Sequence, residues 1–154
     1  MDINHLGHYQ SSSNSQIVQY LPDAIGNGGV EHSGQNDVLK QFQFRNGKLS
    51  SSPVAVSSIT FVNFGVQPSV SANGDKDGIV WASEDIYNSS GAQVNGVLHA
   101  FDANNVAQEL YNSAQNATRD SYGKEIRFTL PTVAHGRVYV VGNAELAIFG
   151  LLSQ

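Results

Sequence analysis

The sequence predicts an all-β fold, and three observations lead to that prediction. Short apolar or alternating segments recur along the chain, separated by turn pairs such as Asn-Gly and His-Gly. Helical periodicity is scarce, and the best candidate, residues 104–110, is short. A pattern of one leucine and one phenylalanine recurs with similar neighbours, which is typical of a repeat protein.

The predicted strands follow one another closely. They cover residues 16–21, 38–44, 68–71, 78–82, 97–101, 109–113, 131–141 (interrupted by a turn) and 146–149. The predicted turns between them are Asn46-Gly47, Asn73-Gly74, Asp77-Gly78, Asn95-Gly96 and His135-Gly136. Residues 85–95 are polar and rich in Ser and Gly, so we interpret them as an inserted loop.

Composition excludes several classes of partner and site. The chain has 154 residues and a formal charge of -5, from 8 Lys and Arg against 13 Asp and Glu. One domain is therefore the default, and an acidic chain offers no electrostatic surface for nucleic acid. Its apolar runs are too short for a membrane-spanning helix. With 0 cysteines, disulfides, thiolate zinc sites and Cys nucleophiles are excluded.

The first residues lack the basic region and apolar run of a secretory signal peptide. This fits either a cytoplasmic protein or a piece of a larger one. Ser, Asn, Gln and Gly take the solvating role usually filled by Lys and Glu, which hints at exported β-proteins.

The strongest feature is an internal repeat. Leu-x-x-Phe occurs at 39–42, 98–101 and 146–149, at intervals of roughly 50 residues. Before two of the copies, an apolar strand ends at Gly and a hairpin returns a strand that carries an aromatic residue, at 68–81 and 131–140. Four short antiparallel strands in each repeat of ~40–50 residues form the blade of a β-propeller. A β-sandwich of about seven strands is the alternative.

Segments 68–74, 78–81, 97–103, 109–113 and 128–140 resemble the quinoprotein-like (pyrroloquinoline-quinone-like) β-propeller superfamily, which is WD40-like. The likeness is to the carboxy-terminal part of large, exported bacterial propeller proteins of unassigned activity. It covers residues 36–152 and is weaker over the first 35. It implies six to eight blades in a full member, and an extracellular or periplasmic location for full-length relatives.

We therefore expect an incomplete β-propeller of about two to three blades. Residues 1–35 form an N-terminal segment with one strand, and the blades lie around 36–60, 66–114 and 126–152. The first copy lacks a clear preceding pair of strands, because residues 26–34 are rich in Gly, and the last copy stops before a fourth strand. Such an open fan exposes sheet edges and apolar faces. The expected partners are the remaining blades or a second copy; a protein or carbohydrate ligand stays open.

One segment has the spacing of a calcium-binding loop. Asn73, Asp75 and Asp77 alternate around a Gly, and Glu84 occupies the twelfth position. Calcium takes six to eight oxygen ligands, which alternating side chains can supply. However, the first ligand is Asn, and a strand through residues 79–82 would carry Glu84 away from the loop. A polar hairpin turn is therefore the alternative.

Other polar residues are weaker candidates. His5 and His8 have the spacing of two metal ligands on one helical turn. The three isolated histidines, His32, His99 and His135, are expected to be structural. Neighbouring Arg119 and Asp120 are expected to hold a loop by a charge-assisted hydrogen bond.

The sequence favours a non-catalytic propeller segment that acts as scaffold or binding surface, with no cofactor other than the calcium considered above. It contains no Gly-x-Ser-x-Gly elbow, phosphate-binding loop or dinucleotide fingerprint. Two alternatives stay open. One is part of a quinone-dependent dehydrogenase, although that family's site motifs match no positions here. The other is a calcium-stabilised adhesion module.

Overall fold

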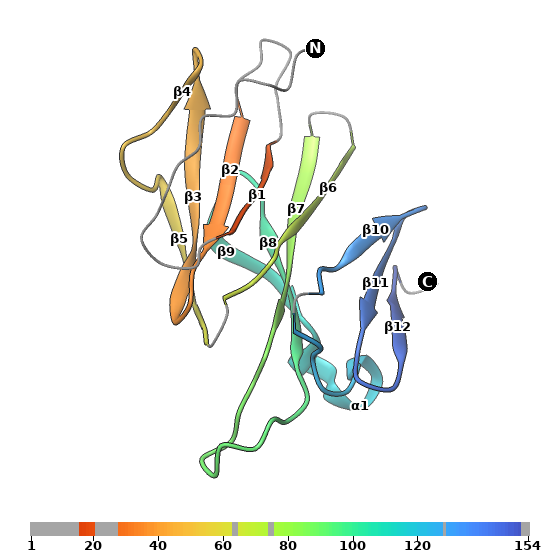
Figure 1. Cartoon of the computed structure of the whole chain (residues 1–154). Coiled ribbons are helices and arrows are strands. Elements are labelled where there is room, and N and C mark those ends of the chain that lie inside the picture. The colour runs from red at the N-terminus through yellow and green to blue at the C-terminus, as the bar shows by residue number, and fades with distance from the viewer. Residues whose placement is uncertain (1–15, 21–27, 63–64, 74–75, 128, 152–154) are drawn as a thin grey trace.

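The computed structural model describes residues 16–20, 28–62, 65–73, 76–127 and 129–151 (Figure 1). Its strands form three antiparallel sheets. Within the described ranges, helix is confined to the single turn η2 (Ser113–Asn116) and the four-residue α1 (Ala117–Asp120). The all-β prediction is therefore confirmed.

The first sheet contains five strands: β1 (Gln16–Tyr20), β2 (Gly28–Ser33), β3 (Asp37–Arg45), β4 (Lys48–Leu49) and β5 (Ala55–Phe61). β1, β2 and β3 are neighbours in chain order, and β4 and β5 both pair with β3. β4 pairs near the end of β3 and β5 pairs near its start, so the fourth position of the sheet is filled by two pieces. The Asn46-Gly47 turn, with φ of 50° and 75°, joins β3 to β4.

β2 corrects the expectation for the first 35 residues, which contribute two strands rather than one. The glycines of residues 26–34 argue against a strand pair, yet Gly28 and Gly29 pair with Phe44 and Gln43 of β3. Strand pairing needs backbone N–H and C=O groups, which glycine supplies, and a well-formed neighbour overrides its low β-propensity. The first sheet therefore begins before residue 36.

The second sheet is a four-stranded meander in chain order: β6 (Ser69–Asn73), β7 (Lys76–Glu84), β8 (Val97–Asp102) and β9 (Asn105–Asn112). The third contains β10 (Thr132–Ala134), β11 (Arg137–Val141) and β12 (Leu146–Phe149) among the described residues. These two sheets coincide with the repeats expected at 66–114 and 126–152.

Three local predictions are wrong. Asn95-Gly96 is not a turn, because Asn95 pairs with Lys124 in an isolated bridge and the Gly96 N–H donates to the Gly123 carbonyl at 2.9 Å. Residues 105–110 lie in β9 rather than in a helix, because they pair with β8. Asp77-Gly78 lies inside β7 rather than at a turn, although Asp77 has the positive φ of 54° that made the pair turn-like.

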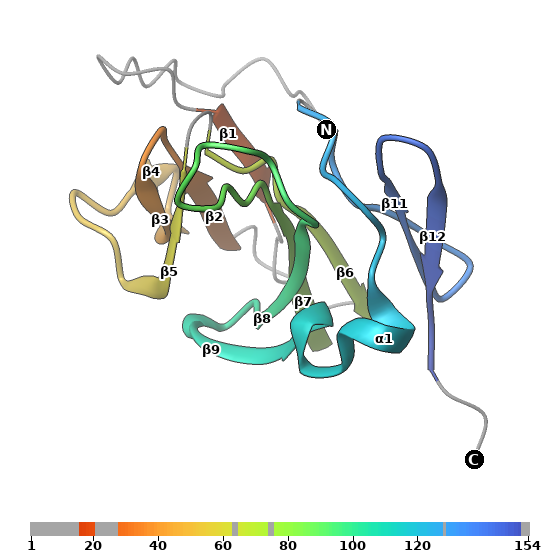
Figure 2. The ribbon, with the colours of Figure 1, turned by 90° about the horizontal axis from the view of Figure 1, so that it is seen from below.

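The sheets pack side by side, with the second in the middle (Figures 1 and 2). One core lies between the first and second sheets and contains Leu39, Phe61, Val66, Val80, Ala82, Phe101, Ala103 and Val106. The other lies between the second and third sheets and contains Leu98, Tyr122, Val138 and Val140, with Trp81 and Phe149 packed against them. The first strands β1, β6 and β10 contact one another in succession, and the outer strand β5 contacts β9. The middle sheet thus buries both faces.

Residues 85–95 form an arm that extends from β7 and β8 (green, at the bottom of Figure 1). The outgoing and returning halves of this loop pair at an isolated antiparallel bridge between Tyr87 and Gln93. At the tip, Asn88 Oδ1 accepts hydrogen bonds from the N–H groups of Ser90 at 3.1 Å and Ala92 at 3.0 Å. Residues 85–95 therefore form a loop between two strands, as predicted.

Among the residues that the structure describes, no helix is long and apolar enough to cross a bilayer.

Candidate functional site

The three Leu-x-x-Phe copies lie on equivalent strands, since β3, β8 and β12 are each the third strand of their sheet. Residues three apart on a strand point to opposite faces. Leu39 and Phe101 both belong to the first core, and Leu98 and Phe149 both belong to the second. In each interface, the motif leucine therefore comes from the earlier sheet and the motif phenylalanine from the later one.

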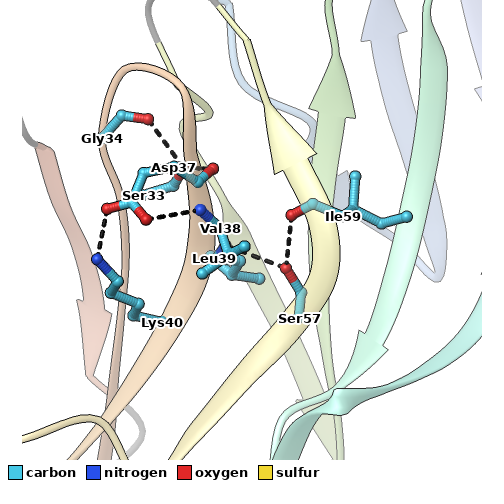
Figure 3. Close-up of polar contacts among 8 residues, drawn as sticks. All are labelled: Ser33, Gly34, Asp37, Val38, Leu39, Lys40, Ser57 and Ile59. Carbon is cyan, nitrogen blue, oxygen red and sulfur yellow. Dashed lines mark hydrogen bonds and ion pairs between the residues drawn. The ribbon is translucent and has the colours of Figure 1, made fainter.

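A buried serine accompanies the motif leucine in two sheets. Register between β3 and β5 shifts at Val38/Lys40, and the Leu39 N–H donates instead to Ser57 Oγ at 3.1 Å (Figure 3). Ser57 Oγ in turn donates to the Ile59 carbonyl at 3.0 Å. Similarly, the Leu98 N–H donates to Ser113 Oγ at 3.0 Å. The repeat therefore extends to a hydrogen bond that the sequence did not reveal.

We expect Ser57→Ala and Ser113→Ala each to lower the free energy of unfolding by about 1–3 kcal/mol, because each leaves a buried leucine N–H without its acceptor. Ser58→Ala, on the exposed face of β5, is the matched control and should stay within about 0.5 kcal/mol of the unmodified chain. Urea titration followed by circular dichroism measures all three. Equal stability of Ser57→Ala and Ser58→Ala would show that the hydroxyl does not serve the N–H.

A second set of polar contacts lies at the turn of the β2–β3 hairpin, close to Ser57 (Figure 3). Asp37 Oδ1 accepts from the Val38 N–H at 2.8 Å, and Oδ2 pairs with Lys40 Nζ. Ser33 Oγ donates to the Gly34 carbonyl at 3.4 Å. These contacts fix the start of β3, the strand that carries Leu39.

The structure places Glu84 far from Asn73 and Asp77, two other residues of the predicted calcium loop. Asn73 and Asp77 lie near the tip of the β6–β7 hairpin, where Asn73 pairs with Lys76. Glu84 ends the same strand, seven residues from Asp77, which is roughly 23 Å of extended chain. Asp75 lies outside the described residues. Glu84 is therefore not brought to the hairpin, and among the described side chains no group of three or more His, Asp or Glu is placed to hold a metal ion.

Glu84 instead belongs to a cluster around His99, which we call the histidine clamp (Glu84, His99 and Glu109). His99 Nε2 lies 3.1 Å from Glu84 Oε2 on β7, and Nδ1 lies 2.6 Å from Glu109 Oε1 on β9. The His99 side chain is 4% exposed. Phe101 stacks on the ring and Phe61 of the first sheet meets it edge-on, each with centroids 5.9 Å apart. The clamp thus joins three strands beneath the neighbouring sheet.

The clamp favours a protonated imidazole. Burial alone would lower the pKa of His99, but hydrogen bonds to Glu84 and Glu109 outweigh it, so the pKa lies above its ordinary value of 6.5. A charged ring donates from both nitrogens, which matches two carboxylate partners. His99 therefore joins β7, β8 and β9 and is not isolated.

A buried carboxylate that the sequence did not single out lies between the second and third sheets. Glu125 accepts hydrogen bonds from three hydroxyl groups: Tyr122 at 2.7 Å, Ser83 at 2.9 Å and Thr129 at 3.0 Å. Burial raises the pKa of Glu125, against the opposing effect of these hydrogen bonds. Burial also raises the pKa of Tyr122. The cluster supplies polar links between the β7 end and the segment that leads into β10.

Arg119 and Asp120 form the expected ion pair, and it closes a loop. The guanidinium Nε and NH2 groups donate to the two oxygens of Asp120, and the Tyr111 hydroxyl donates to Oδ2 at 2.8 Å. The hydrogen bond from Arg119 holds the pKa of Asp120 below its ordinary value. Burial and the Asp120 carboxylate raise the pKa of Tyr111 to about 12. The pair fixes η2 and α1 to the outer strand β9.

The remaining histidines differ in how far the structure describes them. His135 has φ of 50° and precedes Gly136 at 70° in the β10–β11 turn, which confirms it as a turn residue. His5 and His8 lie outside the described residues. His32 lies on β2, and its side chain is not described.

Apolar side chains line the outer face of the third sheet, the face opposite the second core. Leu146, Ile148 and Val141 are 56%, 51% and 42% exposed. Ile148 pairs with Tyr139, and Leu146 pairs with Val141. We call Tyr139, Val141, Leu146 and Ile148 the outer apolar face.

Comparisons of the chain with protein-family models, with curated proteins and with solved structures found no match.

Proposed function

We propose that this chain is a segment of a β-propeller that serves as scaffold and binding surface rather than as a catalyst. Each sheet is a blade in this proposal, and the chain supplies three in succession. The four-stranded middle sheet has the meander order of a propeller blade.

The observation that carries the proposal is the two-sided use of the motif. A repeat protein buries its apolar faces against neighbouring repeats, so each repeat needs one residue for the repeat before and one for the repeat after. Leu39 and Leu98 pack toward the sheet that follows their own, and Phe101 and Phe149 pack toward the sheet that precedes it. The succession of β1, β6 and β10 supports the same arrangement, since first strands lie together around a propeller axis.

The buried ionisable groups support a scaffold role. Both ring nitrogens of His99 are used by Glu84 and Glu109, and both oxygens of Glu125 accept hydrogen bonds from neighbouring hydroxyls. The hydrogen-bonding atoms of these side chains therefore link neighbouring strands and sheets. In this proposal, a partner binds to the loops and the sheet faces, which the sheets hold in place.

Calcium and quinone additions test the non-catalytic part of the proposal. We expect the melting temperature to be the same in calcium and in chelator, and we expect no dye reduction with pyrroloquinoline quinone and calcium. A calcium-dependent rise in melting temperature that disappears in Asp77→Ala would support the adhesion-module alternative instead. Quinone-dependent dye reduction would support the dehydrogenase alternative.

A further inference from the structure

The outer apolar face is the counterpart of a surface that the chain covers elsewhere. Leu146 occupies the motif position held by Leu39 and Leu98, both of which are fully buried against the following sheet. Leu146 is 56% exposed. By analogy with the other two motif leucines, the outer apolar face matches a surface that packs against another sheet of the same kind.

The opposite end of the stack offers the complementary residue. Leu39 and Gln41 of β3 are buried on the side of the second sheet, where Gln41 Nε2 donates to the Ala103 carbonyl. Strand alternation therefore places Phe42 on the outer side of the first sheet, in the motif position of Phe101 and Phe149. Val56 of β5, 45% exposed, lies on the same side.

We propose that a second copy of this chain docks head to tail, so that the outer apolar face of one copy packs on the Phe42 side of the other. Leu146 and Phe42 then share an interface core, as Leu39 and Phe101 do and as Leu98 and Phe149 do. The inference rests on the proposed function. Two copies joined by two such contacts make a ring of about six blades, within the range of about 4–8 for propellers.

Light scattering after gel filtration tests the proposal over a range of protein concentrations. The unmodified chain is expected to have twice the mass of one chain. Leu146→Asp and Val56→Asp are each expected to give single chains with an unchanged β circular dichroism spectrum. Leu110→Asp, at an exposed leucine of β9, is the control and keeps the doubled mass.

Mixing the two single-chain variants distinguishes a head-to-tail contact from a symmetric one. Each variant retains one intact side, so the mixture is expected to recover pairs through a single contact. Ile148→Asp replaces Leu146→Asp if that variant fails to fold. Three results would overturn the proposal: an unmodified chain that stays single at every concentration, a mass that grows without limit, or pairs that persist in Val56→Asp. None of these touches the order of sheets within one chain, which hydrogen exchange tests separately.

Discussion

Leu98→Ala is expected to lower the free energy of unfolding by about 2–5 kcal/mol, while Leu146→Ala changes it by less than about 1 kcal/mol. The two leucines hold the same motif position, but Leu98 is fully buried between two sheets and Leu146 is 56% exposed. Truncation of a buried leucine loses transfer free energy and leaves a cavity, and neither cost applies to an exposed one.

Urea titration measures both variants, at a protein concentration where light scattering shows single chains. Single chains are required because the proposed docking would bury Leu146. An equal loss in the two variants would contradict the assignment of Leu98 to an interface that Leu146 lacks.

His99→Gln is expected to destabilise the fold by about 2–4 kcal/mol near pH 6, because it leaves two carboxylates on neighbouring strands without their cation. Both Glu84 and Glu109 keep some contact with water, with side chains 19% and 25% exposed, which holds the cost below that of a fully buried pair. Glu145→Gln, at an exposed carboxylate in the β11–β12 turn, is the control. Thermal melts of both variants give the comparison.

The clamp also predicts the direction of the pH dependence. The folded state binds the His99 proton more tightly than the unfolded state, whose pKa is near 6.5. The stabilisation is therefore complete below about pH 6.5 and is lost as pH rises through the raised pKa. Burial also raises the pKa of Glu125, so this carboxyl likewise lowers the stability as pH rises, between its unfolded-state and folded-state pKa values. Comparison with His99→Gln isolates the clamp, and a stability difference that does not change between pH 6 and 9 would contradict it.

Local residue chemistry predicts much of this fold. Asn46-Gly47 and His135-Gly136 form turns as expected, because both pairs adopt positive φ. The leucine and phenylalanine pattern located the third strand of every sheet. β2 was missed because glycine has low β-propensity, and its pairing with β3 depends on residues farther along the chain.

The site was harder to predict because it depends on register. Glu84 and Glu109 lie 15 and 10 residues from His99 in the sequence, so only strand pairing brings them together. The β8–β9 register shifts at Phe101, and such irregularities are not visible in an apolar pattern. Glu109 begins the predicted strand 109–113, but Glu84 lies beyond the end of the predicted strand 78–82, so the sequence did not place the two carboxylates together. Glu125 lies outside named strands, in a bridge to Gly142, and no local pattern marks it.

Hydrogen exchange tests most directly the claim that the sheets are successive repeats. Phe61→Ala opens the core between the first and second sheets, and Phe149→Ala opens the one between the second and third. Repeats contact only their neighbours, so Phe61→Ala should leave exchange in β10–β12 unchanged, and Phe149→Ala should leave β3 and β5 unchanged. Uniform loss of protection in all three sheets after either substitution would mean one shared core and would contradict the account.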